Sequence, residues 1–404
     1  MRNNILLAGV ISDKTLANKI FETVSKVYTD LTVTFFKNFN SMKKESDFTF
    51  IDYLLIDMNS EYDNFKEIFT NLKEENPYII RILIVDNFSE YSIMAYHNLV
   101  HFIVEKKYLV EYIKDLFIKA SQLKYILQNE HLIKVLNSFD LNPVIKGPYF
   151  EILQQIQRYD VSLKNVGTLV EKDLMLSTKV LQVSNMTINP RINRITSVKL
   201  AVVNLGINIL RALILSISFF SPEKDLYKSM KYVIQVEYHS LEVAKLALLI
   251  AKELNVSQNI SNDAYTAGLL HDLGRIVIMH RVENWKSIRD EADNHGNPVW
   301  ISEKEIIGAT HMEIGAYFLS IYGFPPSLVD VINYHHYPRS CNDKNSIVLA
   351  ITHVAEAMHH RDKIAEEEMF LKHLDLEYLE KMGIKEKILL FYKKYSGIML
   401  GNDE

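Results

Sequence analysis

The chain has little cysteine, no excess of positive charge and no long apolar run. Cys341 is the only cysteine among 404 residues, so no internal disulfide can form and a reducing compartment is expected. The formal net charge is −5, which leaves no generally basic surface to follow a phosphate backbone. This charge balance argues against nucleic acid as a partner.

Membrane and phosphate-loop signals are also missing. The most apolar segment, residues 212–220, lies between Arg211 and Glu223 and is far shorter than the roughly 20 residues that span a bilayer. The first apolar stretch is too short for a secretory signal before Asp13 and Lys14 appear. The sequence therefore predicts a cytoplasmic protein with no membrane partner, and it contains neither a glycine-rich phosphate loop nor a nucleophile elbow.

The first 120 residues alternate short apolar runs with longer amphipathic ones. Alternation of this kind predicts an α/β domain in which helices wind doubly around a buried parallel sheet. Such sheets place functional groups at the carboxyl ends of their strands. The expected strands are 4–9, 32–36, 53–57, 81–85 and 102–104, and the expected helices are 14–28, 62–75, 89–98 and one that starts at 108.

The rest of the chain is predicted to be helical. The apolar spacing from 108 to 138 indicates one helix that leaves the first domain as a connector, and Pro143 and Gly147-Pro148 mark a boundary. After this point a succession of helical segments, among them 196–203, 206–220 and 261–280, predicts an all-α bundle. The expected domains are 1–122, a connector at 123–144, a helical domain at 145–360 and a helical tail at 361–404.

Asp57 closes the third strand pattern, where a doubly wound domain displays a reactive carboxylate. In this respect the first domain resembles the receiver domains of response regulators, whose aspartate at that point accepts a phosphoryl group. Receiver chemistry also needs an acidic pair after the first strand to hold magnesium. The matching positions here are Gly9 and Val10.

Two further receiver positions depart from the family pattern. The hydroxyl residue expected after the fourth strand is Asp86, and the expected lysine falls on Glu105 or, with a one-residue shift, on Lys106. The first domain is therefore interpreted as a degenerate pseudo-receiver in which Asp57 is not phosphorylated, and Asp57 as a phosphoacceptor is the less favoured alternative. Its expected role is to dock a signalling protein or to form a homodimer.

The stretch Ala267-Gly-Leu-Leu-His-Asp-Leu-Gly-Arg-Ile-Val-Ile278 places His271 and Asp272 in the middle of an apolar predicted helix. An aspartate is almost never buried without a partner. A divalent cation offsets the cost of burying the carboxylate and accepts the imidazole lone pair. The pair therefore predicts a metal site that His239, on the apolar face of another helix, would complete.

This arrangement resembles the HD superfamily of metal-dependent phosphohydrolases. By that resemblance His239 is the first ligand, His271 and Asp272 are the pair, and the closing aspartate falls on His353. The extra ligands of members that hold two or more ions, such as the HD-GYP cyclic-di-GMP phosphodiesterases, match His311, His335 and His336. The resemblance implies one or more divalent ions, with Fe, Mn, Zn and Mg as candidates.

Upstream segments resemble the HDOD domain, a signalling relative of the HD phosphohydrolases. They are residues 170–181, Val183-Ser-Asn185, 195–206 and 210–215, and they join 267–278, 303–315 and 324–338. The HDOD resemblance implies a regulatory module. The predicted function is therefore signal transduction, with the metal as a structural or ligand-binding centre.

Three alternatives stay open. A metal-dependent phosphodiesterase would hydrolyse a cyclic dinucleotide such as cyclic-di-GMP with His271, Asp272 and Arg275, although the Gly-Tyr-Pro signature of the HD-GYP type is absent after the double histidine. An adaptor would need neither metal nor nucleotide. Finally, Glu303 either orients a metal ligand without binding the ion itself or, as its charged neighbours favour, faces solvent.

Overall fold

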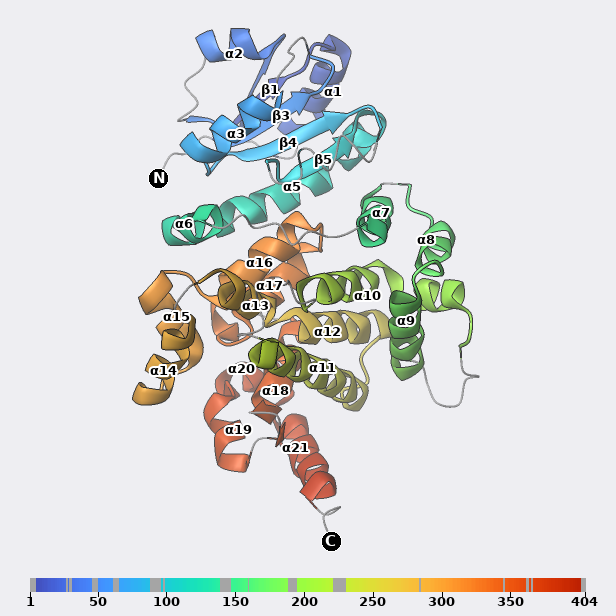
Figure 1. Cartoon of the computed structure of the whole chain (residues 1–404), viewed down its shortest axis with the longest axis vertical. Helices are drawn as coiled ribbons and strands as arrows, with labels where there is room; N and C mark the ends of the chain where they lie inside the picture. The colour runs from blue at the N-terminus through green and yellow to red at the C-terminus, as the bar shows by residue number, and fades with distance from the viewer. Residues whose placement is uncertain are drawn as a thin grey trace. The chain divides into compact units, whose positions relative to one another are not determined.

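The computed structural model describes residues 5–400 except 27, 29–30, 46–49, 61–64, 88–95, 97–98, 139–146, 159, 188–194, 221–229, 283–284, 344–345, 361–362 and 365. Most of the predicted helix 89–98 and the predicted boundary at Pro143 lie outside the described residues. The chain divides into two compact units, whose elements Figure 1 labels. The first consists of residues 1–142, 157–160 and 320–326, and the second of 143–156, 161–319 and 327–404.

The first unit is built on a sheet of five parallel strands in the order β2-β1-β3-β4-β5. This order is that of the flavodoxin-like doubly wound folds, so the predicted α/β class is confirmed. The strands are β1 Ile5–Val10, β2 Leu31–Phe36, β3 Tyr53–Asp57, β4 Ile80–Val85 and β5 Phe102–Glu105.

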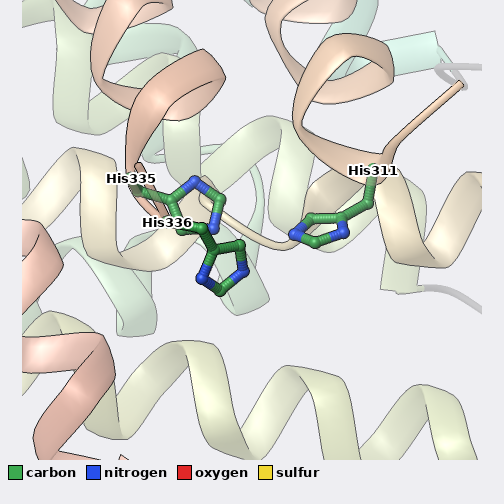
Figure 2. Close-up of side chains that lie close together, drawn as sticks. All are labelled: His311, His335 and His336. Carbon is green, nitrogen blue, oxygen red and sulfur yellow. The ribbon is translucent and has the colours of Figure 1, made fainter. Parts of the chain in front are cut away.

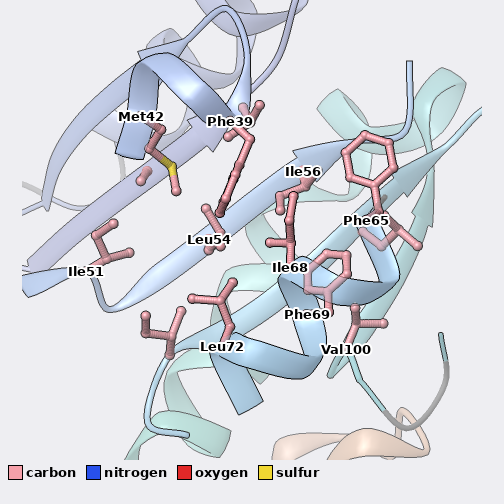
Figure 3. Packing of buried hydrophobic residues seen from close by; sticks show 14 of the residues in the cluster. Phe39, Met42, Ile51, Leu54, Ile56, Phe65, Ile68, Phe69, Leu72 and Val100 are labelled. Carbon is pink, nitrogen blue, oxygen red and sulfur yellow. The ribbon is translucent and has the colours of Figure 1, made fainter. Parts of the chain in front are cut away.

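Helices cover both faces of this sheet, which explains why β3 and β4 are buried along their whole length. On one face, Phe39 of α2 and Phe69 of α3 pack over Leu54 and Ile56 (Figure 3). On the other face, α1 contacts α5. The helices are α1 Lys14–Ser25, α2 Phe39–Glu45, α3 Phe65–Glu75, η2 Lys106–Tyr108, α5 Leu109–Ile126 and α6 Glu130–Ser138.

The helix predicted from 108 to 138 is broken in the structure. It ends as α5 at Ile126 and resumes as α6 at Glu130. The side chain of Asn129 accepts hydrogen bonds from the N–H groups of His131, at 3.1 Å, and Leu132, at 3.4 Å. Asparagine in this position caps the start of a new helix. The apolar spacing continues through both helices, which is why the spacing alone predicted one helix.

The second unit is a bundle of helices with one pair of two-residue antiparallel strands, which confirms the predicted all-α bundle. Its first half contains α7 Gly147–Gln157, α8 Leu163–Val170, α9 Leu174–Thr187, α10 Val198–Phe220, α11 Met230–Glu253, α12 Gln258–Leu270 and α13 Leu273–Arg281. Its second half contains α14 Trp285–His295, α15 Val299–Ile307, α16 His311–Ile321, α17 Pro326–Tyr334, η3 Pro338–Ser340, α18 Ile347–Met358, β6 His359–His360, β7 Lys363–Ile364, α19 Glu367–His373, α20 Leu376–Lys381 and α21 Lys385–Leu400.

Helix α10 is apolar and interrupted. Gly206 has φ 78° and ψ 177°, a conformation that favours glycine, and it divides the element where two helices were predicted. Among the described residues, one helix, Val198–Phe219, is long and apolar enough to cross a membrane, and 67% of its most apolar window is buried inside the structure. Because α10 packs against α8, α9 and α12, this burial is typical of a core helix.

Candidate metal centre

Six of the seven predicted metal ligands converge in the second unit. All but one of the six lie at helix ends, where the chain can direct side chains toward a common point. They are His239 in α11, His271 and Asp272 between α12 and α13, His311 at the start of α16, and His335 and His336 directly after α17.

The His-Asp pair forms a turn, not the middle of a helix as predicted. Helix α12 ends at Leu270 and α13 begins at Leu273. Asp272 occupies the cap position of α13 with φ −97° and ψ 11°, yet its side chain makes no capping hydrogen bond. Nδ1 of His271 lies 2.8 Å from the carbonyl oxygen of Gly268. The break therefore leaves the carboxylate and Nε2 of the imidazole available to the cluster.

Two glycines beside this turn let the ligand-bearing helices approach one another. A Cβ atom on Gly268 would lie 2.8 Å from Cα of Ala244 in α11, and one on Gly274 would collide with the carbonyl oxygen of His311. Gly268 thus allows α12 to pack closely against the helix that carries His239. Gly274 does the same for α13 and the first residue of α16.

The first group of donors joins α11, the His-Asp turn and α18. Nε2 of His239 lies 2.8 Å from Oε2 of Glu356, and Nε2 of His271 lies 3.1 Å from the same oxygen. The three ligand atoms lie within 4.8 Å of one another. The side chains of His239 and Glu356 are 14% and 16% exposed, so this group borders solvent.

Glu356 occupies the place that the sequence assigned to His353, and the prediction that His353 is a ligand is wrong. Nδ1 of His353 lies 2.7 Å from the carbonyl oxygen of His335, and Nε2 accepts the backbone N–H of Asp375 at 2.9 Å. With both ring nitrogens engaged, His353 has no lone pair for a metal. Residues three apart share a helix face, so an acidic residue one turn along α18 was the signal that could have identified Glu356.

The second group of donors consists of three imidazoles, His311, His335 and His336, whose rings point toward one another in Figure 2. The ring centroid of His311 lies 5.5 Å from that of His335 and 5.3 Å from that of His336. One nitrogen from each lies within 4.8 Å of the others. Nε2 of each ring is buried without a hydrogen-bond partner, which is costly unless a bound group takes the lone pairs.

Asp272 lies between the two groups. Oδ1 is 3.4 Å from Nε2 of His311, and Oδ2 is 3.5 Å from Nε2 of His271. Neither oxygen accepts a hydrogen bond, although Nη1 of Arg275 approaches Oδ2 to 3.0 Å. A fully buried carboxylate in this position can contribute one oxygen to each donor group.

The electrostatics of the first group reflect closely spaced acids and bases. Burial lowers the pKa of His271, but the carboxylates of Asp272 and Glu356 outweigh it and raise the pKa to about 9. Burial raises the pKa of Glu356, but the imidazoles of His239 and His271 hold that pKa well below its usual range. Without a cation, the carboxylate is therefore stabilised by imidazolium, a role that a divalent ion can take over.

In the second group, the carboxylates of Asp272 and Glu303 pair with His311 and not with the other two rings. Burial, together with the neighbouring imidazoles, holds the pKa of His335 and of His336 well below its usual range. Both rings are therefore neutral at physiological pH. Neutral imidazole is the form that binds a metal ion.

Glu303 holds His311, one of the three imidazoles of the second group, by hydrogen bonds. Its side chain is 3% exposed, and Oε2 lies 2.7 Å from Nδ1 of His311 and 2.7 Å from the backbone nitrogen of the same residue. The favoured expectation that Glu303 faces solvent is wrong, and the alternative that it orients a ligand agrees with this geometry. Metal-binding histidines commonly use their second nitrogen in this way.

In the first unit, Asp57 lies at the carboxyl end of β3, where the sequence predicted it. Oδ2 is 3.0 Å from Nζ of Lys106, and Oδ1 accepts the backbone N–H of Asn59 at 3.0 Å. The lysine thus follows the one-residue shift, because Glu105 is the last residue of β5. Asp57 is fully buried, so the ion pair compensates its charge.

The acidic position after the first strand differs from the expectation. Because β1 extends through Val10, the assignment of the acidic pair to Gly9 and Val10 is wrong, and Asp13 is the acid that follows. Its Oδ1 caps α1 by accepting the N–H groups of Thr15 and Leu16. Its Oδ2 lies 3.7 Å from Nζ of Lys106, so one carboxylate stands near Asp57 in place of a pair.

The fold and the buried His-Asp turn define the second unit as a helical domain of the HD type. More particularly, residues 143–338 match the family model described as "HDOD domain". The chain therefore contains an HDOD domain at these residues.

Several proteins resemble the chain. An uncharacterized protein from Treponema pallidum is 25% identical over 195 residues, which are 48% of this chain and 37% of that protein. Ribonuclease Y from Thermus thermophilus is 28% identical over 154 residues, which are 38% of this chain and 20% of that enzyme. A solved HDOD domain protein of unknown function from Geobacter sulfurreducens is 20% identical, with a TM-score of 0.49, and the alignment covers 69% of this chain and 95% of that one. The chain thus spans well under half the length of these two curated relatives.

Proposed function

We propose that this chain is a cytoplasmic signal-transduction protein whose HDOD domain holds two divalent ions. The observation that carries the proposal is the set of five buried ligand atoms without hydrogen-bond partners, which are both carboxylate oxygens of Asp272 and Nε2 of His311, His335 and His336. Buried polar atoms rarely stay unsatisfied. Two cations would satisfy all five.

Each ion would have its own ligands and share one. The first position consists of His239, His271 and Glu356, and the second of His311, His335 and His336. Asp272 would contribute one oxygen to each. Imidazole suits iron and zinc, whereas magnesium and manganese favour oxygen ligands. We therefore favour iron and zinc, place manganese next because Asp272 and Glu356 contribute oxygen ligands, and place magnesium last.

The first unit would transmit or receive the signal. Its Asp57 pairs with Lys106, the lysine expected of a receiver, but the loop after β1 contributes a single acid, Asp13, which also caps α1. This favours a pseudo-receiver that docks a signalling protein or a second copy of this chain. A ligand bound at the metal centre would then change the binding of that partner by the first unit. No role in binding nucleic acid or membrane is assigned to this unit.

Metal content tests the proposal directly. We expect about two ions per chain in protein purified without chelator and measured by elemental analysis. Asp272→Ala should lose both, because it removes the shared ligand, whereas Asp290→Ala, an exposed aspartate of α14, should retain them. Protein that takes up no iron, zinc or manganese would contradict the proposal and favour a metal-free adaptor.

A second candidate function is hydrolysis of a phosphodiester, with a cyclic dinucleotide as substrate. Arg275 favours it, because its side chain is 24% exposed while Nη1 stays 3.0 Å from the shared carboxylate of Asp272. In that position Arg275 would orient a phosphate beside the ions. When bound, a pair of divalent ions supplies a water of lowered pKa and neutralises charge on the phosphate. The similarity to ribonuclease Y supports a phosphodiester as the substrate class.

Activity assays distinguish the two candidates. Protein loaded with manganese or iron would be incubated with cyclic-di-GMP and, separately, with a short single-stranded RNA. Hydrolysis of either that is lost in Asp272→Ala and reduced in Arg275→Lys, but kept in Arg289→Lys, an exposed arginine of α14, would establish an enzyme. Two bound ions with no hydrolysis would leave the regulatory function.

A further inference from the structure

His353 connects the second ligand group to the C-terminal part of the chain. Its ring lies between two backbone groups, the carbonyl oxygen of His335 at 2.7 Å from Nδ1 and the N–H of Asp375 at 2.9 Å from Nε2. Because Nε2 accepts from the amide of Asp375, the proton must be on Nδ1, which donates to His335. The ring is 3% exposed, so both hydrogen bonds are shielded from water.

The bond to His335 acts on the peptide that joins the two adjacent ligands. This carbonyl belongs to the peptide plane between His335 and His336, and a planar peptide fixes the direction in which the next residue leaves. The ring of His335 is held separately, because its Nδ1 lies 2.8 Å from the carbonyl oxygen of Ile332. His353 therefore fixes the direction of His336 more than that of His335.

Asp375 is fixed in turn by contacts with the chain just after the ligand pair. Its side chain accepts the N–H of Tyr378 as the cap of α20 and lies 2.8 Å from Nε of Arg339. Arg339 also pairs with Glu377. The hydroxyl of Tyr378 donates to the carbonyl oxygen of Ser346, the cap residue of α18, at 3.1 Å. Helix α20 is thus attached to the chain that follows His335 and His336, at Arg339 and at Ser346, and α19 contacts α18, the helix that carries His353.

We propose that helices α19 and α20, residues 367–381, form a C-terminal brace that positions His336. His353 is the positioning residue through which the brace acts on His336. The proposal rests on the proposed two-ion centre. Asp375 lies beyond the residues 143–338 that match the HDOD family model. Any partner or modification that displaced the brace would loosen one ion position and leave the other intact.

Three substitutions separate the two hydrogen bonds of His353. His353→Phe keeps a ring but removes both bonds. His353→Asn places an amide nitrogen where Nδ1 stands and retains the donor to His335, whereas His353→Gln reaches the position of Nε2 and retains only the bond to Asp375. His373→Gln is the matched control, because His373 is exposed on α19 itself.

The readout is cobalt binding to the full chain, followed by the visible absorption and the dissociation constant of each ion. In His353→Phe and His353→Gln we expect one of the two ions to bind about 10–100-fold more weakly, with partial recovery in His353→Asn and no change in the control. The thermal midpoint of the metal-free variants shows whether each remains folded. If Phe at this position prevents folding, the comparison of Gln with Asn still decides.

The outcomes are distinguishable. Wild-type protein that binds no cobalt contradicts the proposed two-ion function itself. Wild-type protein that binds two ions, together with His353 variants that bind both as tightly, overturns the brace alone. Equal weakening of both ions would also overturn it, because the proposal restricts the effect to the position that contains His336.

Discussion

One carboxylate oxygen of Glu303 lies 2.7 Å from both Nδ1 and the backbone nitrogen of His311. This oxygen accepts the Nδ1 proton, so the lone pair of the imidazole is on Nε2, which points into the cluster. It also satisfies the first N–H of α16, a group that has no partner within its own helix. One buried acid thus fixes the orientation and the tautomer of a candidate metal ligand.

Replacing this acid should weaken the second ion position. Glu303→Gln keeps the shape but removes the charge that favours the Nδ1–H form, so we expect zinc to bind about 10–100-fold more weakly there. Competition with a chromophoric chelator measures the change. Glu305→Gln, an exposed glutamate two residues along the same helix, is the control. Equal zinc affinities in the two variants would show that Glu303 does not orient His311.

The first ion position, to which His239 and His271 contribute, should require Glu356. Glu356→Gln removes the negative charge that His239 and His271 share, so an ion there would lose one anionic ligand. We expect metal content to fall from about two ions per chain to about one, with the remaining ion bound by the three imidazoles. Glu368→Gln, on an exposed position of α19, should keep both ions. Loss of both ions from Glu356→Gln would mean that the two positions are not independent.

The sequence carries more information about the elements of this protein than about its site. Each of the five predicted strands lies within a residue or so of the observed one, because buried parallel strands are continuous apolar runs between turns. The His-Asp pair was identifiable because a buried carboxylate requires a partner. These features depend on local pattern.

The site depended on contacts between distant segments. His353 and Glu356 occupy the same face of α18, and only packing decides which of them meets His239. Gly268 and Gly274 flank the break of the helix at His271, but neither lies at the break itself, so the local sequence does not mark the residue at which the helix ends. For Glu303, charged neighbours suggested a solvated face, but its burial is set by where α15 packs.

Acetyl phosphate should not label the first unit. A receiver aspartate accepts a phosphoryl group beside a magnesium ion held by acidic residues, and near Asp57 the loop after β1 contributes only Asp13, which also caps α1. We expect mass spectrometry after incubation with acetyl phosphate and magnesium to find wild-type protein and Asp57→Asn equally unmodified. A phosphoryl group present on the wild type and absent from Asp57→Asn would make this unit an active receiver.

The first unit should lose stability in mild acid because of a buried histidine. Burial, aided by the nearby guanidinium of Arg81, holds the pKa of His101 well below its ordinary 6.5, and Nδ1 accepts the backbone N–H of Arg81 at 3.0 Å. The folded unit therefore stays neutral at His101, while the unfolded chain takes up a proton below about pH 6.5. Stability is present above this pH and falls by up to about 1.4 kcal/mol for each pH unit below it.

A variant isolates this contribution from that of the other buried histidines. His101→Asn places an oxygen where Nδ1 accepts the hydrogen bond but cannot take up a proton, so the free energy of unfolding should vary less with pH between about 6.5 and 5. Hydrogen exchange of the β4 amides, corrected for the intrinsic rate at each pH, reports on this unit within the full chain. His131→Asn, at an exposed position of α6, should keep the wild-type slope. Identical slopes in wild type and His101→Asn would place the acid sensitivity elsewhere, because the two proteins differ at this unit only in the group that titrates.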